Sequence, residues 1–159
     1  MIYIITHKVF APYFDDKEHY CILHVGENNN SAKNYMRDDS GNDNISEKNS
    51  NFCELTGLYW IWKNGTEKGN DITGLVHYRR YFTTKCNDIL YTYFGIKPEI
   101  LPFNKIQKAL LKSDVILPVP EKIYRTVRQS YVDVHNKEDL ILTRQSISEV
   151  SPEYLDSYD

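Results

Sequence analysis

Apolar residues gather in four short runs that have the β-branched and aromatic composition of buried strands. They cover 2–6, 20–25, 72–78 and 114–119. Pro118 cannot donate to a β-ladder, so it ends the last strand or keeps it at an edge of the sheet. We therefore expect four strands spread along the whole chain.

Helical spacing of apolar residues marks three further segments. The first, 52–63, predicts an amphipathic helix with an N-cap at Asn49 or Asn51 and an end near Asn64. The second is 104–112, with Asn104 as its N-cap and Ile106, Leu110 and Leu111 facing inward. The third covers 137–150.

The order of these elements is strand, strand, long loop, helix, strand, helix, strand, helix. Alternation of this kind is typical of an α/β fold with a mainly parallel sheet and flanking helices, and the 52–63 helix should pack on the sheet. Ligands of such sheets bind beyond the carboxyl ends of the strands. That rule directs attention to His7, to the loop after His24 and to the segment from His77 to Tyr81.

A polar segment, 27–51, is rich in Asn, Ser and Asp and poor in aliphatic residues. It predicts a long loop, and loops of this length inside compact domains usually carry function or are disordered. We expect 37–49 to be ordered and to lie beside His7 and His77.

Composition narrows the class of protein. The chain has 159 residues and a formal net charge of −3, so nonspecific binding of nucleic acid is not expected. One domain over 1–159 fits this length. Three scattered cysteines, with no signal peptide and no apolar run long enough to cross a bilayer, favour the cytoplasm, including the inner face of the membrane.

The sequence lacks the common motifs of dinucleotide, P-loop, zinc-protease and serine-hydrolase sites. Its strongest cluster is HYRRYF at 77–82, where guanidinium groups suited to a diphosphate leave a strand. Strand alternation would put Arg79 on the face of His77 and Arg80 on the other face. Arg79 would then bind the ligand, and Arg80 would pair with a carboxylate such as Glu54 or Asp114. The alternative is a surface strand with one structural ion pair.

Other polar residues support weaker hypotheses. Asp38 and Asp39 lie in a segment with the composition of a metal loop, but it lacks the ligand pattern of a calcium loop, and a self-bonded polar turn is the better explanation. Glu54 is the one acid among apolar neighbours. It either faces a site or lies near the N-terminus of the helix, where a carboxylate is stabilising. His135 and Asp139 are four residues apart, so a helix would place them on one face.

Several strings resemble a bacterial domain family catalogued as of unknown function. They are THK at 6–8, RDDSGNDNIS at 37–46, KNSNFCELTGLYWIWKN at 48–64, GLVHYRRYF at 74–82 and DVILP at 114–118, followed by Tyr131, His135 and Asp139. The family occurs in capsular and exopolysaccharide biosynthesis proteins. Its members are regarded as glycosyltransferases, some linked to galactofuranose transfer. The resemblance covers nearly the whole chain.

The resemblance implies a GT-A-like fold and a nucleotide-diphosphate-sugar donor. The matching positions are His7, Asp38, Asp39, Asn44, Ser46, Asn49, Glu54, Tyr59, Trp60, His77, Arg79, Arg80, His135 and Asp139. Glu54, Asp38, Asp39 and His135 are the candidate catalytic residues, and His7, Asn44, Ser46, Asn49, His77, Arg79, Arg80 and Asp139 are the candidate substrate-binding residues.

The resemblance therefore predicts transfer of a sugar to a glycan or lipid-linked acceptor in cell-surface polysaccharide biosynthesis. No Asp-x-Asp pair stands at the place where such folds bind Mn²⁺ or Mg²⁺, so cationic side chains would replace the metal. Members of the family usually run longer, and we expect a domain that is incomplete at its C-terminus. The alternatives are a noncatalytic sugar-binding or scaffold domain and a metal-dependent hydrolase using Asp38, Asp39, His77 and His135.

Overall fold

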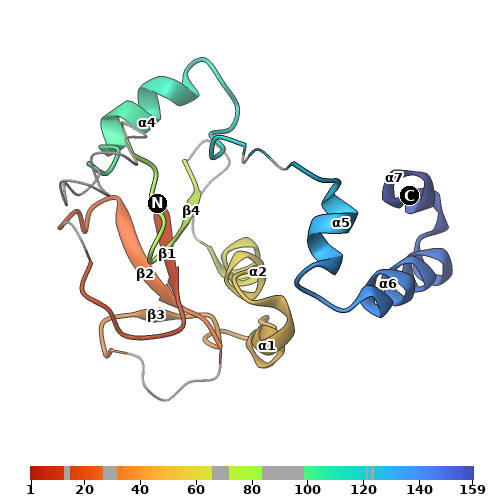
Figure 1. Ribbon diagram of the computed structural model, residues 1–159. Helices are drawn as coiled ribbons and strands as arrows, with labels where there is room; N and C mark the ends of the chain where they lie inside the picture. The colour runs from red at the N-terminus through yellow and green to blue at the C-terminus, as the bar shows by residue number, and fades with distance from the viewer. Residues whose placement is uncertain (13–14, 27–31, 66–71, 84–98, 121, 123) are drawn as a thin grey trace. The chain divides into compact units, whose positions relative to one another are not determined.

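The computed structural model describes residues 1–12, 15–26, 32–65, 72–83, 99–120, 122 and 124–159 (Figure 1). These form two compact units, Met1–Leu117 and Pro118–Asp159, and each is described by itself. The expectation of one domain over the whole chain stays a prediction.

The first unit is built on a four-stranded parallel sheet. Its strands are β1 (Ile2–Thr6), β2 (Tyr20–His24), β3 (Met36–Arg37) and β4 (Gly74–His77), arranged in the order β3-β2-β1-β4. Every residue of β1 is buried, as expected of a central parallel strand that is covered on both faces. The predicted α/β class and parallel sheet are confirmed.

Helices cover the two faces of this sheet. Successive side chains of β1 point to opposite faces, so Ile2 and Ile4 join a cluster with Ile106 of α4 (Phe103–Leu110). Tyr3 and Ile5 join a second cluster with Trp60 and Ile61 of α2 (Leu55–Asn64) (Figure 1). The predicted packing of the 52–63 segment on the sheet is confirmed.

Gly57 lets α2 approach the sheet closely. A Cβ at this position would lie 2.8 Å from Ile5 Cδ1 and 2.9 Å from Val25 Cγ1, distances that real Cβ atoms essentially never show. The missing side chain therefore brings the backbone of α2 down onto β1 and the residue that follows β2.

The predicted 52–63 helix is in fact two helices. A first short helix, α1 (Asn49–Phe52), ends at Cys53, whose φ of 47° lies in the left-handed region, and α2 starts two residues later. A nonglycine residue there interrupts the helical path. The predicted end near Asn64 is confirmed.

The predicted strand at 114–119 is wrong. Val115 and Leu117 are exposed, and only Ile116 packs partly against the core. Pro118 and Pro120 have no N–H group to offer a neighbouring strand, so the apolar run stays irregular.

The helix predicted at 104–112 has different ends and a narrower buried face. It begins at Phe103 after Pro102, so Asn104 is not its N-cap. Ile106 is buried as predicted and Leu110 packs against the core, but Leu111 is 84% exposed. Leu111 lies just beyond the helix, where the 3.6-residue period no longer directs its side chain inward.

The long polar segment contains more structure than a simple loop. It includes the edge strand β3, the 3₁₀-helix η1 (Ser46–Lys48) and α1. β3 has only two residues, too few to show a periodic pattern in the sequence.

The second unit is helical. It contains α5 (Val127–Val132), α6 (Lys137–Val150), the 3₁₀-helix η2 (Pro152–Tyr154) and α7 (Leu155–Tyr158). The predicted bounds of α6 are confirmed, and the side chain of Asn136 caps it by accepting the Glu138 N–H. Arg144 pairs with Asp159 and so ties α6 to the end of α7. No helix of either unit, within the described residues, is long and apolar enough to cross a bilayer.

Candidate active site

The strand order of the sheet has a switch point between two neighbouring strands. From β1 the chain adds β2 and β3 on one side and then returns to place β4 on the other, so the direction of strand addition reverses between β1 and β4. In open α/β sheets, ligands bind at such a switch point, outside the carboxyl ends of the strands. His7 and Lys8 follow β1 directly, and His77 is the last residue of β4.

A tight turn follows β4. The Arg80 N–H donates to the His77 carbonyl at 2.9 Å, and the His77 N–H donates to the Arg80 carbonyl at 3.2 Å. The predicted alternation of His77 and Arg79 against Arg80 is therefore wrong, because strand geometry stops at His77. Both arginines belong to one turn at the switch point.

His77 has a defined partner at each ring nitrogen. Its Nδ1 accepts the Arg79 N–H at 3.2 Å, and its Nε2 lies 3.6 Å from Glu54 Oε1. With Nδ1 as the acceptor, the neutral ring carries its proton on Nε2, toward Glu54. Burial lowers the pKa of His77. Glu54 raises that pKa, while Arg79, Arg80 and His7 lower it.

Glu54 is placed by the break between α1 and α2. The residue before it, Cys53, donates its N–H to the Asn49 carbonyl at 2.8 Å and accepts a hydrogen bond from Asn49 Nδ2 at 2.7 Å. The same Nδ2 also donates to Thr56 Oγ1 at 2.9 Å. Asn49 thus holds both ends of the turn that carries Glu54.

We call His7, Lys8, Glu54, His77, Arg79 and Arg80 the switch-point cluster. Glu54 pairs with His77, and the predicted ion pair of Arg80 with Glu54 or Asp114 does not form. Among the described residues, no carboxylate lies within ion-pair distance of the three permanent cations of the cluster. The cluster therefore has excess positive charge, although the chain as a whole is acidic.

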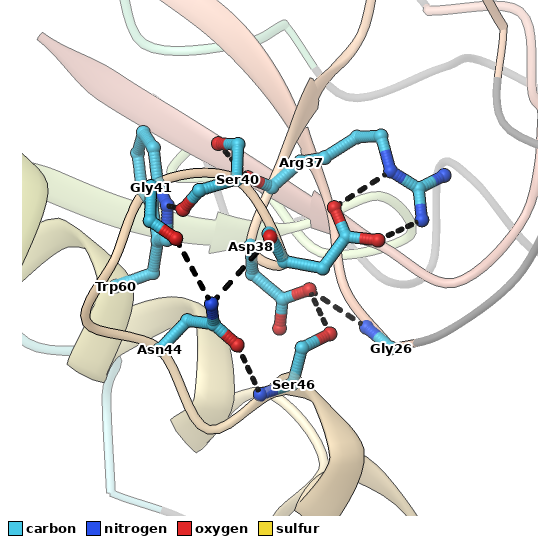
Figure 2. A network of polar contacts seen from close by, with 9 residues as sticks. Gly26, Arg37, Asp38, Ser40, Gly41, Asn44, Ser46 and Trp60 are labelled. Carbon is cyan, nitrogen blue, oxygen red and sulfur yellow. Dashed lines mark hydrogen bonds and ion pairs between the residues drawn. The ribbon is translucent and has the colours of Figure 1, made fainter.

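A second polar group lies in the segment after β3, and we call it the 37–46 network (Figure 2). At its centre is Asp38, which is 1% exposed. Asp38 Oδ1 accepts the Gly26 N–H at 2.9 Å and the Ser46 hydroxyl at 2.6 Å. Asp38 thereby ties the end of β2 to the start of η1.

The remaining bonds of the 37–46 network stay close to this segment. Arg37 Nε donates to Asp39 Oδ1 at 2.8 Å, and Arg37 Nη2 pairs with Asp39 Oδ2. Asn44 Nδ2 donates to the Gly41 carbonyl at 3.3 Å, and Trp60 Nε1 donates to the Ser40 carbonyl at 2.7 Å (Figure 2). These contacts anchor the segment to α2.

The 37–46 network is ordered, as predicted for this part of the loop. Its position beside His7 and His77 stays a prediction, because no hydrogen bond or ion pair between described residues joins Asp39 or Asn44 to either histidine. The contact that the structure shows instead is with β2, where the Asp38 N–H donates to the His24 carbonyl at 3.0 Å.

Sequence reasoning did not select His24 as a site residue. Its side chain is fully buried, and in the described part of the chain no hydrogen-bond partner reaches either ring nitrogen. Burial lowers the pKa of His24, as does the nearby charge of Arg37, while the charge of Asp38 raises it. The available signal was its position, because His24 ends β2 just as His77 ends β4.

His135 and Asp139 belong to the second unit. Both contact Tyr131: the His135 ring stacks on it with centroids 4.5 Å apart, and the Tyr131 hydroxyl donates to Asp139 Oδ2 at 3.3 Å. His135 precedes α6, so the pair is joined through this tyrosine rather than by a shared helix.

The donor set of the switch-point cluster does not fit Mn²⁺ or Mg²⁺. These ions prefer several oxygen ligands, and the cluster offers the single carboxylate of Glu54 beside three permanent cations. Elsewhere in the described ranges, no three His, Cys, Asp or Glu side chains come together in a way that could hold a metal ion.

Comparisons with known proteins agree with this architecture. The model of a family described as a domain of unknown function (DUF4422) matches residues 1–159. The structure is similar to the apo structure of the WbbM bifunctional glycosyltransferase, with a TM-score of 0.69 and 26% sequence identity. That match covers 96% of this chain and 29% of the WbbM chain. A search of curated proteins found no match.

Proposed function

The chain belongs to the DUF4422 family, and we propose that it is a glycosyltransferase that moves a sugar from a nucleotide-diphosphate sugar to a glycan or lipid-linked acceptor in cell-surface polysaccharide biosynthesis. The observation that carries the proposal is the cationic switch-point cluster, which lies where α/β sheets bind ligands. Similarity to part of a glycosyltransferase structure supports the reaction class.

In this proposal Arg79 and Arg80 bind the diphosphate of the donor. Negative charge grows on the leaving nucleoside diphosphate as its bond to the sugar breaks, and fixed cations stabilise that charge. His77 lies between the Arg79 backbone and Glu54, with its Nε2 toward the Glu54 carboxylate, and His7 would line the same edge of the sheet.

We assign Glu54 as the general base for transfer with inversion. It would accept the proton of the acceptor hydroxyl while that oxygen bonds to the anomeric carbon. Glu54 is half exposed and has no hydrogen bond from a described residue, whereas Asp38 is buried and Asp39 is bound by Arg37. In this scheme Asn44, Ser46 and Asn49 position the loop and the Glu54 turn.

A donor panel tests the proposal. The protein is titrated with uridine- and other nucleotide-diphosphate sugars, with and without Mn²⁺ or Mg²⁺, and nucleotide release is then followed with glycan acceptors. We expect one donor to bind without added metal and its nucleotide to be released faster with an acceptor. Binding without any release would indicate a sugar-binding domain, and absence of binding across the panel would overturn the proposal.

A further inference from the structure

Lys8 is the one member of the switch-point cluster for which the sequence suggested no role. It lies two residues after the end of β1, and its backbone is fixed by Thr6, which is 1% exposed. The Lys8 N–H donates to Thr6 Oγ1 at 3.1 Å, and the same hydroxyl donates to the Lys8 carbonyl at 2.6 Å. A buried side chain thus determines where Lys8 leaves the sheet.

The ring of Tyr78 connects Lys8 to the turn after β4. Lys8 Nζ and Arg79 Cζ each lie 5.2 Å from the centroid of this ring, within the usual range of a cation–π contact. The two cationic groups are therefore no more than twice that distance apart. Tyr78 is 6% exposed, and its N–H donates to the Ile5 carbonyl at 3.0 Å, so its place between the two strands is fixed.

Two like charges held near one ring repel each other, and the ring offsets only part of that cost. No carboxylate among the described residues pairs with either cation. We infer that Lys8 and Arg79 form a two-point binding site for a diphosphate group, with Tyr78 as the platform that sets their separation. A diphosphate fits better than a monoanion because each of its two phosphates can accept a charge-assisted hydrogen bond from one cation.

This inference rests on the proposed function only for the identity of the donor, because the site itself needs only an anion with two charged groups. It adds Lys8 to the groups that hold the leaving nucleoside diphosphate. It also gives a role to a lysine two residues after the central strand: Lys8 approaches the switch point from the β1 side, while Arg79 approaches it from the β4 side.

The test uses inorganic pyrophosphate as the probe, by calorimetric titration of the full chain at low salt. We expect Lys8→Gln and Arg79→Gln each to weaken binding about tenfold or more, the loss typical of one charge-assisted hydrogen bond. Lys108→Gln on α4, also an exposed lysine, is the matched control and should stay within about twofold of the parent. Urea unfolding of each variant confirms that it is folded.

The inference is overturned if the parent does not bind pyrophosphate at millimolar concentrations, or if Lys8→Gln binds it as the parent does. Its failure is distinguishable from failure of the proposed function. Normal sugar transfer by Lys8→Gln would remove the lysine from the site and leave the transferase intact. Pyrophosphate binding with no transfer from any donor would keep the site and refute the transferase.

Discussion

Two polar groups lie beyond the carboxyl ends of the same parallel sheet and differ in how their charges are balanced. In the 37–46 network, Asp38 accepts hydrogen bonds from Gly26 and Ser46, and Asp39 is paired with Arg37. In the switch-point cluster, three permanent cations have no carboxylate partner among the described residues. Internal balance stabilises a loop, whereas unbalanced charge favours binding of an anion.

The comparison predicts that changes in the switch-point cluster affect function, while changes in the 37–46 network affect stability. The largest expected effect is that of Glu54→Gln, which removes the proposed base and should lower the transfer rate about 10²- to 10⁴-fold. Its free energy of unfolding should change by less than about 1 kcal/mol, because the pair with His77 is half exposed.

Steady-state kinetics with the donor found in the panel, together with urea unfolding, measure both quantities for Glu54→Gln. Glu47→Gln, an exposed acid on η1, is the control and should match the parent in each assay. A Glu54→Gln enzyme with the parent rate would show that another group accepts the proton.

Asp38→Ala should have the largest effect on stability. It leaves the Gly26 N–H and the Ser46 hydroxyl buried without their acceptor, at a cost of about 1–3 kcal/mol each. We expect the free energy of unfolding, measured in urea, to fall by about 3 kcal/mol, and folded protein to keep its pyrophosphate affinity. Asp15→Ala, at an exposed carboxylate, should change stability by less than about 0.5 kcal/mol. Lost pyrophosphate affinity in folded Asp38→Ala would contradict the separation of the two groups.

Acid should destabilise the first unit through the buried His24 and the partly buried His77. The pKa values of His24 and His77 are lowered in the folded state, so the unfolded chain binds protons more readily. Stability is therefore complete above the unfolded pKa of about 6.5 and falls below it, by up to about 1.4 kcal/mol per pH unit for each histidine. Urea unfolding between pH 7.5 and 5 measures this slope, which should be shallower in His24→Gln. An unchanged slope in that variant would assign the effect to other groups.

The smallest effect is expected for Asp39→Asn. The ion pair with Arg37 is about one-third exposed and screened by water, so its loss should cost less than about 1 kcal/mol. Thermal unfolding at low and high salt measures the difference, which should shrink as salt is added. A cost as large as that of Asp38→Ala would show that the pair, rather than the buried carboxylate, organises the network.

Sequence patterns predicted the parallel sheet because the apolar runs that contain β1, β2 and β4 belong to a chain in which strands alternate with helical segments. They predicted the bounds of α6 to the residue. They failed at 114–119, where an apolar run contains proline and finds no strand partner in the described structure. The apolar composition of a run therefore did not distinguish a strand of the sheet from the irregular segment at 114–119.

The candidate site was predictable in its location but not in its contacts. The position of His77 at the end of a strand followed from the sequence, but the turn that brings Arg79 and Arg80 together depends on where β4 stops. The pairing of Glu54 with His77 joins residues far apart in the sequence and arises from the packing of α2 on the sheet. Such tertiary contacts leave no periodic pattern in the chain.

The left-handed backbone at Cys53 fixes the direction of the Glu54 side chain that follows it, but it also lowers the stability of the folded protein. A nonglycine residue in this region costs about 1–3 kcal/mol, a penalty that the two hydrogen bonds between Cys53 and Asn49 help to offset. Glycine would relieve the penalty and also widen the range of directions open to the neighbouring carboxylate. Selection for a more heat-resistant protein would therefore favour glycine at this position, and selection for turnover would oppose it.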